Sequence, residues 1–188
     1  MFKERSFMKL FLVVTLTFWG LNTFAAETPT ITKTSTTHVH REHKAHDHGA
    51  GQIGLVFDGT DGKIDFDIPA ESIVGFEYEP KKLADKKKLS DSLQTLRSKI
   101  NDMIVFDGKS KCEITAQSVE VERSEAKHSE IEAQYSVKCL QSPVGGTVTF
   151  KLHSQFKRIK KLQVQVVIDT LQKSAEVSKD GEKIDLKP

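Results

Sequence analysis

The strongest constraint on the fold is a period of two in the apolar residues, which recurs along most of the chain. Residues 53–57 alternate apolar with small or polar side chains, the turn-forming stretch 58–62 follows, and residues 64–68 alternate again. Successive side chains of a β-strand point to opposite faces, so this pattern predicts a hairpin with one buried face. Further strand-like segments follow at 147–152, 162–168, 175–177 and 184–186.

One long segment, Lys81–Met103, has the period of an α-helix instead. Its apolar side chains recur at the spacing that gathers them on one helix face. They are Leu89, Leu93, Leu96, Ile100 and Met103. Charged residues, including the run Lys86 to Lys88, occupy the opposite face, and we interpret them as solvent-exposed. We therefore expect residues 52–188 to form one α+β domain, a mostly antiparallel β-sheet of about seven strands with one main amphipathic helix.

The N-terminus has the pattern of an export signal. The apolar run Leu10–Leu21 follows several basic residues and precedes the stretch Thr23 to Ala25. This arrangement is typical of a secretory signal peptide, here residues 1–25. The run is shorter than the roughly 20 apolar residues of a membrane span, and no cysteine directly follows it to carry a lipid. We expect a periplasmic protein with no membrane span after signal cleavage.

The charge of the chain argues against a nucleic-acid partner. The formal net charge is only +2, from 28 Lys and Arg against 26 Asp and Glu. That excess falls within the signal peptide, which carries Lys3, Arg5 and Lys9 against Glu4. Domains that bind nucleic acid concentrate positive charge on one face. The mature chain has no such excess.

The chain contains two cysteines, Cys112 and Cys139. An even number of cysteines in an exported protein predicts one structural disulfide. The alternative is a pair of zinc-ligating thiolates, which lacks the C-x-x-C spacing that supplies neighbouring ligands.

The cysteines lie near the outer ends of two strand-like segments, 111–123 and 129–140. If these segments form an antiparallel hairpin, a cross-strand cysteine pair fixes its register and places the turn over Ser124–Lys127. In that register Val119 and Val121 fall on the face opposite to the disulfide. We therefore predict a β-bulge near Gln117-Ser118 that switches the buried face.

The stretch between the signal peptide and the domain, residues 26–51, has few apolar side chains, so we expect it to be disordered. Five of the seven histidines of the chain lie in an eleven-residue part of it. They are His38, His40, His43, His46 and His48. We call residues 38–48 the His-rich segment. Neutral imidazole is a common ligand of Zn²⁺, and four of these rings could surround one ion.

Intrinsic affinity would favour Cu²⁺ over Zn²⁺ at such a segment, and Ni²⁺ is a further candidate. The alternative is a solvated polar tail in which histidine happens to be frequent. A cloning tag is less consistent with the sequence, because these histidines are spaced and internal.

Several motifs along the mature chain resemble those of the ZrgA-like periplasmic zinc-binding proteins, a domain-of-unknown-function family with a His-rich N-terminal segment. The matching motifs are His46-x-His48-Gly49, Pro69-Ala70-x-x-Ile73-Val74-Gly75-Phe76-Glu77, His128-x-x-x-x-Ala133-x-Tyr135-x-x-x-Cys139 and Leu162-x-Val164-Gln165-Val166. The resemblance therefore extends across most of the mature chain.

The resemblance implies a periplasmic protein that binds zinc and supports zinc acquisition, as an accessory to a component of a zinc transport system. It also implies six ligand histidines by position. They are His46, His48 and His128, joined by His38, His40 and His43 from the tail. Similar members often carry a histidine after the Phe-Glu of the second motif, where this chain has Tyr78. From the residues alone, His128 beside the expected turn is more typical of an exposed histidine without a role, and it is the resemblance that makes it a candidate ligand.

The sequence shows no sign of catalysis, since H-E-x-x-H, G-x-S-x-G and phosphate-binding glycine loops are all missing from it. We therefore expect a monomeric, non-enzymatic zinc-binding protein. Two alternatives stay open. One is an envelope protein-protein interaction module whose histidines tune a contact by pH, and the other is a zinc-dependent hydrolase with an open water position on the metal.

Overall fold

The structure, a computed structural model, describes residues 49–123 and 128–188. Within these residues, nine strands and three helices form two β-sheets with helices packed against them. In chain order the elements are β1 (Ala50–Asp58), β2 (Asp61–Pro69), α1 (Ala70–Val74), α2 (Leu83–Ser98), α3 (Ile100–Met103), β3 (Ile104–Phe106), β4 (Cys112–Arg123), β5 (Ser129–Cys139), β6 (Thr147–Phe150), β7 (Lys161–Ile168), β8 (Leu171–Val177) and β9 (Glu182–Asp185).

The larger sheet has six strands in the order β4-β5-β2-β1-β7-β8, and the smaller sheet has the order β3-β6-β9. All neighbouring strands run antiparallel except β1 and β7, which are parallel. The expected α+β fold with a mostly antiparallel sheet is confirmed. The β1–β2 hairpin turns at residues 58–61, as the alternation predicts.

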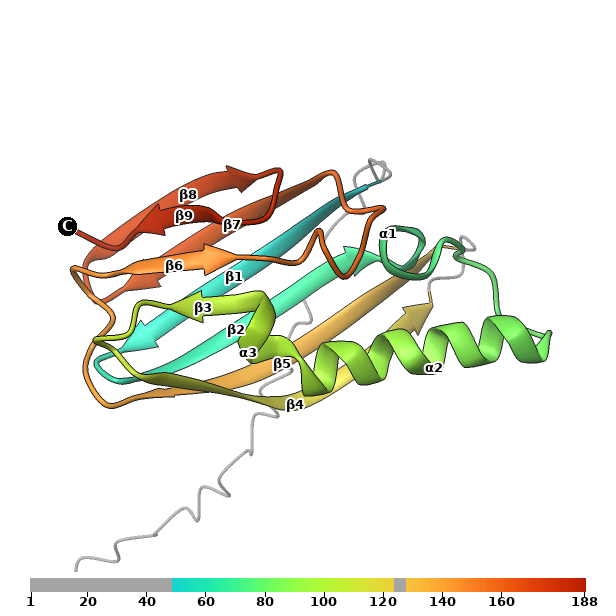
Figure 1. Ribbon diagram of the computed structural model, residues 1–188, viewed down its shortest axis with the longest axis horizontal. Coiled ribbons are helices and arrows are strands. Elements are labelled where there is room, and N and C mark those ends of the chain that lie inside the picture. The colour runs from blue at the N-terminus through green and yellow to red at the C-terminus, as the bar shows by residue number, and fades with distance from the viewer. Residues whose placement is uncertain (1–48, 124–127) are drawn as a thin grey trace, which may run out of the picture. The chain divides into compact units, whose positions relative to one another are not determined.

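The smaller sheet and the helices lie over one face of the larger sheet (Figure 1). The hydrophobic core fills the space between the layers, and its most completely buried side chains include Leu55, Tyr135 and Phe150. Phe57 of β1 meets Phe106 of β3 edge to face, with ring centroids 5.4 Å apart, and so links the two sheets. Strand alternation explains this core, because every second side chain of the large sheet faces inward.

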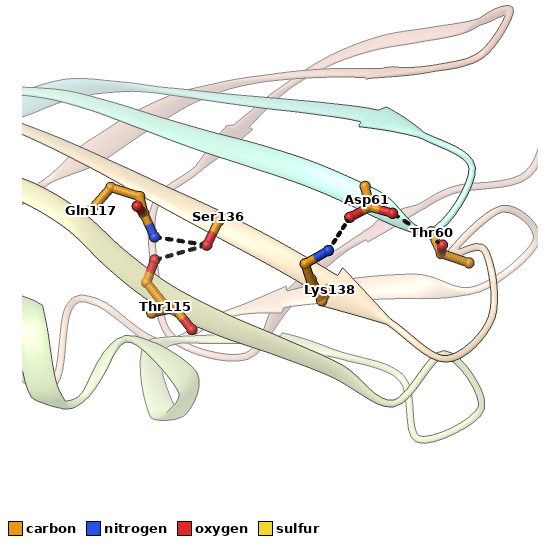
Figure 2. A network of polar contacts seen from close by, with 6 residues as sticks. All are labelled: Thr60, Asp61, Thr115, Gln117, Ser136 and Lys138. Carbon is orange, nitrogen blue, oxygen red and sulfur yellow. Dashed lines mark hydrogen bonds and ion pairs between the residues drawn. The ribbon is translucent and has the colours of Figure 1, made fainter.

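The opposite face of the large sheet is polar, and Figure 2 shows part of it. The Gln117 amide donates to the Ser136 hydroxyl at 2.9 Å across β4 and β5. The Lys138 ammonium lies 2.7 Å from the Asp61 carboxylate across β5 and β2. This contact holds the pKa of the Asp61 carboxyl below its ordinary value and raises the pKa of Lys138.

The β4–β5 hairpin has the register predicted from the cysteines. Cys112 pairs with Cys139 and forms the disulfide, so these two residues are not zinc-ligating thiolates here. The register shifts between Ala116 and Ser118, which confirms the predicted bulge. The expected turn over Ser124–Lys127 lies outside the described residues.

Several element boundaries differ from the expected ones. The predicted helix over Lys81–Met103 is two helices, because Lys99 has the non-helical angles φ −114° and ψ 14° between α2 and α3. The apolar stripe nevertheless continues across this break, since Ile100 and Met103 of α3 are buried. Strand β1 begins at Ala50, two residues before the expected domain start. Helix α1 and strand β3 were not expected. Among the described residues, no helix combines the length and apolar character needed to cross a membrane.

Candidate metal centre

The His-rich segment joins the folded domain at Gly49, and this junction is tightly held. The Gly49 amide donates to the Ser72 hydroxyl of α1 at 3.1 Å, and its carbonyl accepts from the amides of Lys160 and Lys161. Its φ of +90° favours glycine, and a Cβ here would lie 2.8 Å from the Lys160 side chain. The glycine that follows His48 is therefore required by the local backbone.

Helix α1 connects this junction to a histidine–carboxylate pair. The helix ends at Gly75, whose φ of +84° gives it a left-handed cap, and Glu77 follows two residues later. The Glu77 carboxylate oxygen Oε2 lies 2.8 Å from Nδ1 of His128. The Ser129 hydroxyl, which is buried, donates to the Glu77 carbonyl oxygen at 2.6 Å. Two contacts thus fix Glu77 against the start of β5.

The chemistry of this pair suits a metal ligand with a supporting carboxylate. A carboxylate accepts a hydrogen bond from Nδ1–H, so Nε2 of His128 is the ring nitrogen that carries the lone pair. The His128 side chain is 48% exposed, whereas the Glu77 side chain is only 14% exposed. Ligand histidines commonly donate their other ring nitrogen to a carboxylate in this way, which fixes the ring and raises its basicity.

The second oxygen of Glu77, Oε1, is buried and has no hydrogen-bond partner within the described part of the chain. A buried carboxylate oxygen without a partner is costly. The contact with His128 holds this carboxylate through its other oxygen, Oε2.

The junction and the pair lie at the same end of the large sheet. Strand β1 begins there, β2 ends there, and β5 begins there, as Figure 1 shows around α1. Two strand spacings, about 10 Å, separate the start of β1 from the start of β5. Three residues of extended chain span about the same distance. His46 precedes Gly49 by three residues, so the covalent chain is long enough to bring it to His128, whereas His48 directly precedes the junction.

The outer face of the sheet carries carboxylates at this same end. Glu132 of β5 lies between Glu120 of β4 and Asp67 of β2, and Glu130 lies opposite Glu122. Partial burial first, and then the hydrogen bond and charge of Glu122, raise the pKa of Glu132 to about 7. These acids lie on the neighbouring strands β2, β5 and β4, so the sheet fixes the distances between their backbones.

The described residues alone do not complete a metal site. Across residues 49–123 and 128–188, no three His, Cys, Asp or Glu side chains are grouped so that they could hold an ion. His128 is the single predicted ligand that falls among the described residues. The other five, His38, His40, His43, His46 and His48, lie outside them.

Sequence reasoning did not single out Glu77 as a functional residue. Its signal was its place in the Ile-Val-Gly-Phe-Glu motif, directly after Phe76. The next residue is Tyr78, whose ring stacks on that of Phe76 with the ring centroids 4.8 Å apart. The Tyr78 hydroxyl donates to Asp85 at 3.1 Å, and this bond raises the pKa of Tyr78.

His153, which we expect to be structural or solvated, lies elsewhere in the fold. Its Nδ1 is 3.7 Å from the Asp180 carboxylate, and its side chain is 13% exposed. Neither ring nitrogen has a hydrogen-bond partner in the described part of the chain. Among the described residues, His153 is not grouped with other His, Cys, Asp or Glu side chains that could hold a metal ion with it.

An α+β domain that carries a carboxylate-supported histidine, at the end of the sheet where a His-rich segment is joined to it in sequence, defines a class of candidate metal-binding proteins. The model of one family, described as ZrgA family zinc uptake protein, matches residues 45–186. The chain belongs to this family, as the motifs predict. No curated protein matches the chain. The matched range begins inside the His-rich segment and covers nearly all of the folded domain.

Proposed function

We propose that this protein is a non-enzymatic periplasmic carrier that captures Zn²⁺ and supplies it to a zinc transport system. Family membership supports a role in zinc uptake. The pattern of a signal peptide over residues 1–25 supports export, and the His-rich segment supplies five imidazoles. In this proposal zinc is the cargo of the protein.

The observation that carries the proposal is the Glu77–His128 pair beside the junction of the His-rich segment. His128 is half-exposed and its ring is fixed by a carboxylate 2.8 Å away. Because the described residues hold no set of three ligands, a tetrahedral zinc site at this end requires ligands from another part of the chain. His46 and His48 are the histidines nearest in sequence to the junction.

We infer that His128 is the ligand supplied by the folded domain and that Glu77 positions it. The remaining ligands come from the His-rich segment, with His46 and His48 first and His38, His40 and His43 after them. A site shared between domain and segment can take up an ion in steps, and it can release the ion as segment histidines exchange with a partner.

The experiment is a calorimetric zinc titration of the untagged mature protein and two deletion variants of equal length. Deleting residues 38–48 removes all five segment histidines, whereas deleting residues 27–37 removes eleven residues without a histidine. We expect the first deletion to lose most of the bound zinc and the second to retain it. Both should keep the unfolding transition of the domain, because β1 begins only at Ala50.

Equal zinc stoichiometry in the two deletion variants would contradict the proposal. Competition with Cu²⁺ and Ni²⁺ in the same titration tests the identity of the metal. Intrinsic affinities favour copper, but metal selectivity in the cell also depends on which metal is available. Under the proposal, zinc is the ion that the protein binds in the periplasm.

A further inference from the structure

The two edges of the large sheet differ in how they are protected. Strand β4 forms one edge, and side chains from the helices occupy its backbone groups. The Asn101 amide of α3 donates to the Ile114 carbonyl, and its oxygen accepts from the Ile114 amide, both at 2.8 Å. Arg97 of α2 donates to the Val119 carbonyl. With its bulge, β4 has the features by which proteins prevent edge-to-edge pairing.

Strand β8, Leu171–Val177, forms the opposite edge and has no such protection among the described residues. All seven of its residues pair with β7 in an unbroken antiparallel register. It contains no proline and no bulge. Across residues 49–123 and 128–188, no helix side chain forms a hydrogen bond with its backbone. Figure 1 shows β8 at the edge of the sheet farthest from α2.

The charged side chains of β8 are also held away from this edge. A lysine on an edge strand usually discourages pairing. Here the Lys173 ammonium donates to the Asp185 carbonyl of β9 at 2.9 Å. The Glu176 carboxylate accepts from the Gln163 amide of β7 at 2.7 Å, over the sheet face. The two charged side chains are therefore bonded to β9 of the smaller sheet and to β7 of the large sheet.

The sequence of β8 is complementary to itself when two copies run antiparallel about Ser174. In this register Leu171 lies opposite Val177 of a second copy, Gln172 opposite its Glu176, and Lys173 opposite its Ala175. All seven residues pair, apolar residues meet, and no like charges face each other. Centring on Lys173 instead would place two lysines opposite each other, and centring on Ala175 would leave the pairing shorter.

We propose that β8 is an interaction surface for a second copy of this chain, whose antiparallel pairing joins the two large sheets into one continuous sheet of twelve strands about a twofold axis at Ser174. Such an interface is isologous, so it closes as a dimer and does not extend into a filament. This inference replaces the expectation of a monomer. It does not depend on the zinc proposal, and it predicts no change in zinc bound per chain.

Cross-linking tests the register directly. In the Ser174→Cys variant, two cysteines would face each other across the axis at a Cα distance of about 4.5–5.5 Å, within reach of a disulfide. The natural cysteines are both in the Cys112–Cys139 disulfide and do not compete. The matched control is Gln165→Cys, at the exposed β7 position that pairs with Ser174. Two such cysteines would lie three strand spacings apart, about 14 Å.

Under mild oxidation, we expect the Ser174→Cys variant to form a covalent dimer and the Gln165→Cys control to stay uncross-linked. The unmodified protein should sediment as a concentration-dependent dimer. Gln172→Glu, opposite Glu176, should weaken the dimer at least about twofold, and Gln172→Lys should strengthen it by a similar factor.

Three outcomes would overturn the inference. One is a monomer at all concentrations up to hundreds of micromolar, which includes the case that another segment of the same chain covers β8. Another is a dimer in which Cys at position 174 cross-links no better than the control. The third is a dimer whose stability responds equally to both Gln172 variants, because the charge opposite would then not be Glu176.

Discussion

At the scale of single residues, the contact between Glu77 and His128 is the clearest link between fold and proposed chemistry. The carboxylate holds Nδ1 and so sets which ring nitrogen can bind a metal. The exposed fractions of the two side chains, 48% for His128 and 14% for Glu77, are those of an accessible ligand and its covered support. The role proposed for Glu77 is therefore to position the ligand.

We predict that Glu77→Gln weakens zinc binding by roughly tenfold to a hundredfold, the usual loss when the carboxylate behind a ligand histidine is removed. His128→Ala should lose at least as much, because it removes the ligand itself. The measurement is a zinc titration of both variants, with thermal unfolding in a chelator as the control for folding. Unchanged affinity in both variants, with the fold intact, would place the site entirely outside the folded domain.

Glu132 supports a second residue-scale prediction, on stability against pH. Its pKa in the folded protein is raised to about 7 from the ordinary 4.5, by burial and by Glu122. The folded state therefore binds more protons than the unfolded state between these values, so the contribution to stability is present below about 4.5 and is lost as the pH rises through about 7.

Glu132→Gln should remove this pH dependence. At pH 8 the variant should be more stable than the natural protein by a few tenths of a kcal/mol, since solvent screens an exposed group. At pH 4 the two proteins should differ little. Urea denaturation at both pH values measures the effect, and equal stability differences at the two values would show that Glu132 titrates normally.

At the scale of elements, the most informative region is the edge strand β4 and what covers it. The sequence predicted the register of β4, because the cysteine pair sets which residues of the hairpin lie opposite each other. It also predicted the bulge, because the apolar residues switch from even-numbered to odd-numbered positions along the strand. It did not predict that Asn101 would bond both backbone groups of Ile114. The apolar stripe predicts which helix face is buried, but it carries no signal for the break at Lys99, after which Asn101 meets the strand.

We predict that Asn101→Ala lowers the free energy of unfolding by about 1–3 kcal/mol, because it leaves an amide and a carbonyl of Ile114 without their partner. Asn101→Asp keeps the acceptor but sets a carboxylate oxygen against the Ile114 carbonyl oxygen, so its loss should be at least as large at neutral pH. Urea denaturation with the disulfide intact provides the measurement. If both variants were as stable as the natural protein, water would satisfy these groups and the helices would not protect the edge.

At the scale of the whole molecule, the sheet places chain segments together that the sequence keeps far apart. The parallel pairing of β1 with β7 joins residues more than a hundred positions apart, and no local pattern encodes it. This pairing and α1 together fix Gly49 at the end of the sheet where β5 begins. The sequence predicted the His-rich segment and His128 separately, and the topology brings Gly49, which follows that segment, to the end of the sheet where His128 precedes β5.

This arrangement predicts how zinc affinity depends on pH. Each histidine ligand must be neutral to bind, and imidazole ordinarily takes up a proton near pH 6.5, so well below that pH each ligand costs about a tenfold loss of affinity per pH unit. A site built from His128 and several segment histidines should therefore lose affinity by a factor of about a thousand or more per unit between pH 6 and pH 5. His128→Ala should reduce that slope by one factor of ten, provided that no other histidine takes its place.

Zinc titrations against a competing chelator of known pH dependence measure this slope in the natural protein, the His128→Ala variant and the variant lacking residues 38–48. The deletion should leave a slope no steeper than tenfold per unit, because His128 is the one predicted ligand that it retains. If the natural protein lost only tenfold per unit, a single imidazole would bind the ion, and the shared site between segment and domain would be wrong. If the affinity were unchanged over this range, histidine ligation would be wrong altogether.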